Sequence, residues 1–224
     1  MKTLFTTIAI LTVSLGFSQS KFESAILRGK QMINDADTVT EMQNAANYFQ
    51  RIAQKETEEW LPWYYQAQIT CFMASNNPDV DSKENQLNKA LELIESGNKI
   101  EKNAELLALE GFVQMLRVSV DPATRGQKLS PVVFGLYNQA LAIDPENPRA
   151  RLFLGQFQYG TAQFFGTGFE EACVNVKKAY DIFENQPSEP TIYPSWGMGS
   201  ARALRLTDSW LRQETMREGC GIFR

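Results

Sequence analysis

YNQALAIDPENPRARLFLG, the stretch from Tyr137 to Gly155, contains two helical patterns on either side of one short turn. Apolar residues recur at intervals of three and four on both sides, and most of the other residues are good helix formers. Pro145 cannot continue a helix, whereas Pro148 suits the first position of the next one. The stretch therefore predicts two helices joined by a tight turn, and such short connections favour antiparallel neighbours.

The same helical pattern extends outward from this stretch over most of the chain. Its breaks are short and rich in Asn, Asp, Pro and Gly, and no segment shows the alternation that indicates a β-strand. Thr38 and Glu41 have the spacing of a capping box, and Ser82 with Asn85 has a weaker form of it. The predicted helices lie near residues 22–34, 38–55, 59–75, 82–98, 103–120, 127–143, 148–163, 169–184 and 197–213.

The residues around the central turn resemble the junction between two tetratricopeptide repeats. Tyr137, Ala140, Pro145 and the pair Leu154-Gly155 fall at the spacings of that family. The resemblance implies an all-α fold, a right-handed superhelix of antiparallel helix pairs (a TPR-like α-solenoid) closed by a C-terminal helix. A related class of helical repeat and an irregular helical bundle remain alternatives. The four pairs would lie near residues 22–56, 57–98, 103–144 and 147–184, with the closing helix from about 197.

The N-terminus has the pattern of a signal peptide. Lys2 precedes an uncharged apolar run from Thr3 to Phe17, and Ser18 and Ser20 offer small residues for cleavage. The run is shorter than the roughly 18 to 20 residues that a membrane span requires. We therefore predict that residues 1–20 are removed on export, and that the product is periplasmic or secreted without a stable membrane span.

Residues 21–224 are predicted to form one TPR-like helical-repeat domain, because no long Pro-, Gly- or Ser-rich linker divides them. A hydrophobic content of 43% supplies a core. The net charge of -4 and the pI of about 5.1 argue against a nucleic-acid partner, which would require clustered Lys and Arg.

Several kinds of chemistry are excluded because the chain contains no histidine. Nucleophile–histidine pairs and imidazole metal ligation both require it. Cys71, Cys173 and Cys220 form no CxxC motif and permit at most one internal disulfide; Cys71 and Cys173 have the apolar helical surroundings of buried thiols, and Cys220 is expected to be accessible. We predict a non-catalytic protein with no cofactor and no bound metal.

Paired carboxylates leave one enzymatic alternative, glycoside hydrolysis. The candidate pairs are Glu58-Glu59, Glu170-Glu171, and Asp208 with Glu214. Adjacent residues on a helix point about 100° apart, so the first two pairs are better interpreted as acidic first turns that complement helix dipoles.

Aromatic residues supply a possible ligand platform. Trp60, Trp63 and Tyr64 recur at helical spacing on one face, which favours packing between repeats. The alternative is a binding surface for a sugar ring or another small ligand, formed by Trp60, Trp63 or Trp196, the last of which lies beside two glycines.

The resemblance also implies a groove lined by the first helix of each pair, suited to a peptide or a partner helix. We therefore predict an exported, non-catalytic scaffold or adaptor that binds a protein or peptide partner of the cell envelope. The alternative function is a carbohydrate- or small-ligand-binding helical module that uses exposed aromatic residues. The predicted groove residues are Glu58, Tyr65, Gln68, Glu105, Phe112, Arg149, Gln156 and Tyr159.

Overall fold

A computed structural model describes residues 21–186 and 190–206 of the chain. Most of these residues are helical and none forms a β-strand, in agreement with the predicted all-α fold. None of the helices among them is long and apolar enough to cross a membrane. The predicted signal peptide, and Asp208, Glu214 and Cys220, lie outside the described residues.

The first helix in the described part spans residues 21–34. Eight further helices follow within the described ranges: α2 (Val39–Lys55), α3 (Leu61–Asn76), α4 (Val80–Ile100), α5 (Ala104–Val120), α6 (Pro122–Ile143), α7 (Pro148–Phe165), α8 (Glu170–Glu184) and α9 (Met198–Leu206).

Local side-chain caps explain where several helices begin. The Thr38 hydroxyl accepts from the Glu41 amide and the Glu41 side chain accepts from the Thr38 amide, so the predicted capping box is confirmed. The predicted capping box of Ser82 with Asn85 was wrong. Asp79 is the N-cap of α4, and its side chain accepts from the Ser82 amide. Asn147 caps α7, with Pro148 as the first helical residue.

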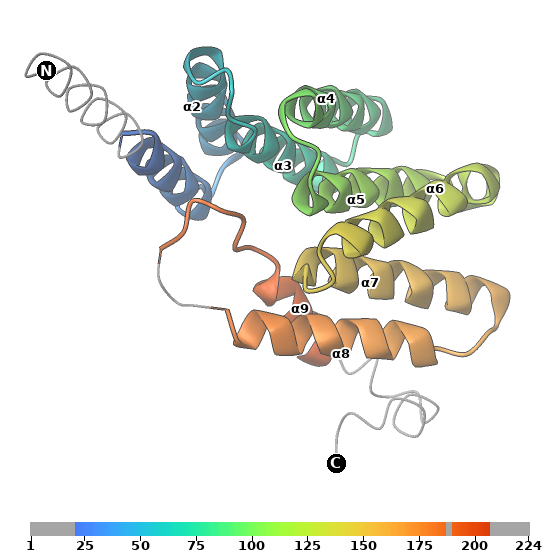
Figure 1. The fold of residues 1–224 in the computed structure, drawn as a ribbon. Coiled ribbons are helices and arrows are strands. Elements are labelled where there is room, and N and C mark those ends of the chain that lie inside the picture. Colours follow the sequence, from blue (N-terminus) through green and yellow to red (C-terminus); the bar gives the residue numbers. More distant parts are fainter. Residues whose placement is uncertain (1–20, 187–189, 207–224) are drawn as a thin grey trace, which may run out of the picture.

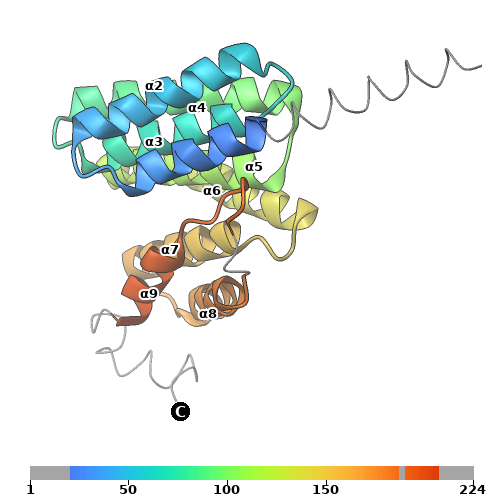
Figure 2. The same ribbon diagram turned by 90° about the vertical axis from the view of Figure 1, so that its left-hand side faces the viewer.

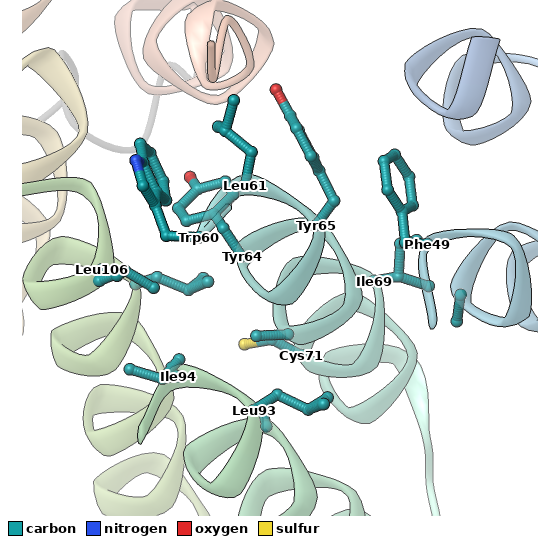
Figure 3. Packing of buried hydrophobic residues seen from close by; sticks show 14 of the residues in the cluster. Phe49, Trp60, Leu61, Tyr64, Tyr65, Ile69, Cys71, Leu93, Ile94 and Leu106 are labelled. Atoms are coloured by element: carbon teal, nitrogen blue, oxygen red, sulfur yellow. The ribbon is translucent and has the colours of Figure 1, made fainter. Parts of the chain in front are cut away.

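Neighbouring helices pack in chain order from α2 to α9, and α5 also contacts both α3 and α7 (Figure 1). Two hydrophobic clusters result. The first is centred on α3, where Trp60, Tyr64 and Tyr65 lie among Phe49 of α2 and Leu106 of α5 (Figure 3). The second joins α5 to α9. Because α5 contributes buried residues to both clusters, it connects the two halves of the molecule.

Two glycines allow close contacts between helices in the second half. A Cβ atom at Gly111 would lie 2.6 Å from the ring of Tyr137, which is fully buried. A Cβ atom at Gly155 would lie 2.7 Å from a Val176 methyl group on α8. Tyr137 therefore fills space that Gly111 leaves open, and Gly155 allows α7 to approach α8.

The segment from Pro190 to Gly197, here called the strap, has no regular secondary structure. It passes beside the helix of residues 21–34 and then returns to the start of α9 (Figures 1 and 2). Its contacts with α3, α5 and α7 form the candidate site.

Candidate functional site

Aromatic rings from three helices converge on Trp196 of the strap. Phe72 of α3, Phe112 of α5 and Phe153 of α7 have ring centroids 5.1, 6.3 and 5.5 Å from that of Trp196. Phe112 and Phe153 are stacked, with centroids 4.4 Å apart. We call these four residues the Trp196 cluster. Phe72, Phe112 and Trp196 are only half-buried, so the cluster combines a packed interior with an accessible edge.

Side-chain donors from the helices hold the strap in place. Lys30 Nζ lies 2.5 Å from the Thr191 carbonyl oxygen, 2.6 Å from that of Tyr193 and 3.1 Å from Ser195 Oγ. The Tyr65 hydroxyl donates to the Ile192 carbonyl oxygen at 2.6 Å. An ammonium group has three donors, and the strap supplies an acceptor for each of them. The strap is thus fixed to helices far away in the sequence.

A buried ion pair and a buried tyrosine hold the backbone and the side chain of Trp196. Arg149 and Glu105 form a bidentate pair with both N···O distances 2.6 Å, and Arg149 Nη1 also donates to the Trp196 carbonyl oxygen at 3.0 Å. The Trp196 indole N–H donates to the Tyr64 hydroxyl at 2.8 Å, and that hydroxyl lies 3.4 Å from Glu105. Asn147 donates a further hydrogen bond to Glu105. The network fixes the orientation of the indole ring.

The pKa values in this network follow from its burial and charges. Burial opposes the charged form of Arg149, but the adjacent Glu105 carboxylate raises the Arg149 pKa above its usual range. Burial, and then the charge of Glu105, raise the pKa of Tyr64. Arg149 therefore stays ionised and Tyr64 stays neutral, so the hydrogen bonds around Trp196 do not change at ordinary pH.

A pocket of about 430 Å³ adjoins the Trp196 cluster and shares Phe72 with it. We call it the Phe72 pocket. Its apolar wall includes the thioether side chains of Met42 and Met73, and none of the side chains that line it, all within the described residues, is basic. It is lined by Ala36, Asp37, Thr38, Val39, Met42, Phe72, Met73, Asn76, Asn77, Pro78 and Gln86.

The residues predicted for the groove have separate environments. Glu105 and Arg149 form the buried pair, Tyr65 and Gln68 are buried on α3, and Phe112 belongs to the Trp196 cluster. Glu58 is exposed before α3, and Gln156 and Tyr159 are half-buried on α7. The structure brings Tyr65, Phe112 and Arg149 together around the strap. Tyr159 instead packs against Phe169, with the two rings tilted relative to each other.

Only one of the three tryptophans predicted as a ligand platform belongs to this site. Trp60 is 8% exposed and packs edge-on against Tyr64, which supports the interpretation of core packing. Trp63 is half-buried and packs against the first core cluster. Trp196 is half-buried at the centre of the ring cluster.

Sequence reasoning missed Phe72, Phe153, Met42, Met73 and Lys30. Phe72 follows Tyr65 by two helical turns, so the helical period alone could have assigned both to one face of α3. No sequence pattern around Lys30 indicates its contact with the strap, because the acceptors of its hydrogen bonds are more than 160 residues away in the chain.

Two cysteines and two of the acidic pairs that the sequence singled out lie within the described residues. Cys71 is a fully buried free thiol, and burial raises its pKa. Cys173 is buried, as its apolar surroundings predicted, and it is disulfide-bonded. Within the described part of the chain, no group of three or more Cys, Asp or Glu side chains could hold a metal ion. Glu170 and Glu171 occupy the first turn of α8, as the helix-dipole interpretation predicted. The same interpretation was wrong for Glu58 and Glu59, because α3 begins only at Leu61 and its first turn contains no acidic residue.

Comparison with known proteins supplies a fold relationship. No protein-family model matches the chain, and neither does any curated protein. Among solved structures, the fold is similar to that of the HusA haemophore from Porphyromonas gingivalis, with a TM-score of 0.74 and 24% sequence identity. The match covers 85% of this chain and 94% of that chain. At this identity the likeness concerns the fold.

Proposed function

We propose that this chain is an exported, non-catalytic binding protein for a flat, largely apolar ligand of the porphyrin class, including haem. The observation that carries the proposal is the double position of Phe72, which lines the pocket and packs against the half-buried ring of Trp196. A structure of similar fold that is named a haemophore supports this choice of ligand.

A porphyrin suits this surface in both shape and polarity. Its planar ring can stack on the accessible edges of Phe72 and Trp196, since aromatic pairs contribute about 0.5–1.5 kcal/mol beyond the area that they bury. No basic side chain lines the pocket, so the propionate groups would extend into solvent. We therefore expect the affinity to change little with ionic strength, because exposed charges without a partner contribute little to binding.

The helix-pair architecture is part of the proposal, whereas the predicted groove for a partner is less favoured. We infer that the helices form a right-handed superhelix of tetratricopeptide type, supported by their packing in chain order and by the contacts of α5 with α3 and α7. A peptide bound at Tyr65 and Arg149 would first have to displace the strap, which accepts hydrogen bonds from both. Binding of a small ligand beside the strap requires no such displacement.

The test is titration of the purified chain with haemin and with metal-free protoporphyrin IX, followed by absorbance and by quenching of tryptophan fluorescence. We expect Trp196→Ala to weaken the binding of both porphyrins about tenfold, which corresponds to about 1.4 kcal/mol. Phe164→Ala is the matched control, because this ring is 67% exposed and contacts Phe165 rather than the Trp196 cluster. Absence of saturable binding, or equal weakening by both substitutions, would refute the proposal.

A further inference from the structure

A second, polar groove lies between α2, α3 and α4, on a face of α3 that does not contact the strap. Its volume of about 340 Å³ is near the lower end of the range for small-molecule sites, about 300–1,000 Å³. It adjoins the Phe72 pocket, with which it shares Met73 and Gln86. We call it the amide groove, because its polar lining includes Gln43 and Asn47 of α2, Gln66 and Thr70 of α3, and Ser82 and Gln86 of α4.

The lining of the amide groove is almost without charge, although 21% of the residues in the chain are charged. Lys89 is the one charged side chain among the described residues that line it, and it already pairs with Glu92 at 3.0 Å. A charged ligand that leaves water requires a partner of opposite charge, and the groove offers none that is uncompensated. The groove therefore suits a neutral ligand.

Hydrogen bonds within α3 leave acceptor atoms on the floor of the groove. Gln66 is only 5% exposed, and its side-chain amide group donates to the Pro62 carbonyl oxygen at 3.3 Å. Within the described part of the chain, the side-chain oxygen of Gln66 has no hydrogen-bond partner. The buried Thr70 hydroxyl uses its proton on the Gln66 backbone carbonyl oxygen at 2.8 Å, so its lone pairs can accept. The floor thus requires a ligand that donates.

Hydrogen bonds on the two walls have the opposite result and leave donors. Asn77 donates to Ser82 Oγ at 2.8 Å and to Gln86 Oε1 at 3.2 Å. The hydroxyl proton of Ser82 and the amide protons of Gln86 therefore remain for a ligand. On α2, Gln43 donates to Asn47 Oδ1 at 2.9 Å, which leaves the amide protons of Asn47. The walls thus require a ligand that accepts.

We propose that the amide groove binds a neutral saccharide of one or two sugar units. A hydroxyl group both donates and accepts, whereas carboxylates and phosphates only accept and ammonium groups only donate. The hydroxyls of a sugar surround its ring, so they can reach the floor and both walls together. A peptide backbone carries its polar groups along two edges and would leave one side of the groove without partners. The inference does not depend on the proposed porphyrin site.

The experiment is an NMR titration of the isotope-labelled full chain with three neutral disaccharides, namely maltose, cellobiose and N,N′-diacetylchitobiose. The blocked peptide acetyl-Gly-Ser-Gly-amide is the comparison ligand. We expect at least one disaccharide to produce saturable shifts of the side-chain amide signals of Asn47 and Gln86. The peptide should produce none. Absence of saturable shifts with all three sugars, or tighter binding of the peptide, would overturn the inference.

Two variants locate the sugar in the groove. Gln66→Leu removes the floor acceptor at similar volume and should weaken sugar binding about tenfold, because a hydroxyl of the ligand then loses its partner. Asn47→Ala removes a wall donor at an exposed position, where the fold does not depend on the side chain, and should weaken binding about three- to tenfold.

Asn44→Ala is the matched control, because Asn44 is also exposed on α2 but does not line the groove. It should leave sugar binding unchanged, and equal weakening by Asn44→Ala and Asn47→Ala would refute the assignment. Asn47 does not line the Phe72 pocket, so Asn47→Ala should bind haemin like the unmodified chain. Loss of one ligand therefore leaves the test of the other intact.

Discussion

Gly155 tests, at the scale of one residue, how closely α7 and α8 must approach. A Cβ atom there would lie 2.7 Å from the Val176 methyl group and 2.9 Å from the Ala172 carbonyl oxygen. The carbonyl belongs to the α8 backbone and cannot rotate away. We expect Gly155→Ala to lower the free energy of unfolding by about 1–3 kcal/mol, measured by urea denaturation.

Gly160 on the same helix provides the control. No atom lies within 4 Å of a Cβ placed there. Because alanine is a better helix former than glycine, Gly160→Ala should raise the free energy of unfolding by about 0.5–1 kcal/mol. A loss of stability at both positions would mean that the contact with α8 is not the cause.

Lys30 gives a second prediction at the residue scale, on the effect of pH. Burial, and then the charge of Arg149, lower its pKa to about 8, whereas a lysine in the unfolded chain titrates near 10.4. Between these values the unfolded chain holds a proton that the folded chain has lost. The contribution of Lys30 to folding stability should therefore rise with pH from about 8 to 10.4 and be constant below that window.

The measurement is urea denaturation of the unmodified chain and of Lys30→Met between pH 7 and pH 9.5. Staying below pH 10 avoids Tyr64 and Tyr65, whose raised pKa values reduce stability as the pH rises further. The difference in unfolding free energy between the two proteins should grow in favour of the unmodified chain above pH 8. A constant difference would show that Lys30 is solvated like a surface lysine.

The capping box of α2 gives the prediction at the scale of one element. Thr38→Ala removes the hydroxyl that accepts from the Glu41 amide, and one donor at the helix start loses its partner. We expect the free energy of unfolding to fall by about 1 kcal/mol. Thr40→Ala, also exposed at the start of α2, should change it by only a few tenths. The measurement is thermal unfolding followed by circular dichroism. A similar loss of stability in both variants would argue against a stabilising role of the Thr38 cap.

The elements that could be predicted from sequence are those whose ends are set by neighbouring residues. The predicted range 38–55 agrees with α2 because Thr38 and Glu41 cap it, and the predicted start of α7 agrees because Pro148 fixes it. The start of α6 was predicted at residue 127, yet the helix begins at Pro122, where Asp121 caps it. The Asp121 side chain accepts from the Thr124 amide and Pro122 suits the first helical position, so α6 begins directly after the break between the two helices.

The candidate site was harder to predict because its parts come together only in the folded molecule. Arg149 and Phe112 were predicted as surface residues of an open groove. Instead, Arg149 is 3% exposed, since it pairs with Glu105 and donates to the strap. The position of the strap depends on donors distant in sequence, and the helical period contains no information about them.

At the scale of the whole molecule, the chain consists of two core clusters that share α5, Phe112 and Trp196. Proteins built from stacked helix pairs unfold cooperatively only as far as the contacts between neighbouring units couple them. Trp196 contacts rings on α3, α5 and α7, and its backbone and indole are bound to Arg149 and Tyr64. The strap therefore adds a long-range connection to the contacts that α5 already makes.

We expect Trp196→Ala to weaken this coupling as well as the stability. The unmodified chain should unfold in urea with one midpoint for residues 21–100 and residues 104–184, monitored by hydrogen exchange, whereas the variant should show two midpoints and a shallower overall transition. Tyr193→Ala is the control on the same segment, because its side chain is 57% exposed and its carbonyl oxygen, which accepts from Lys30, remains. If Trp196→Ala shifts both halves together, α5 alone couples them, and the role of the strap is confined to the ligand site.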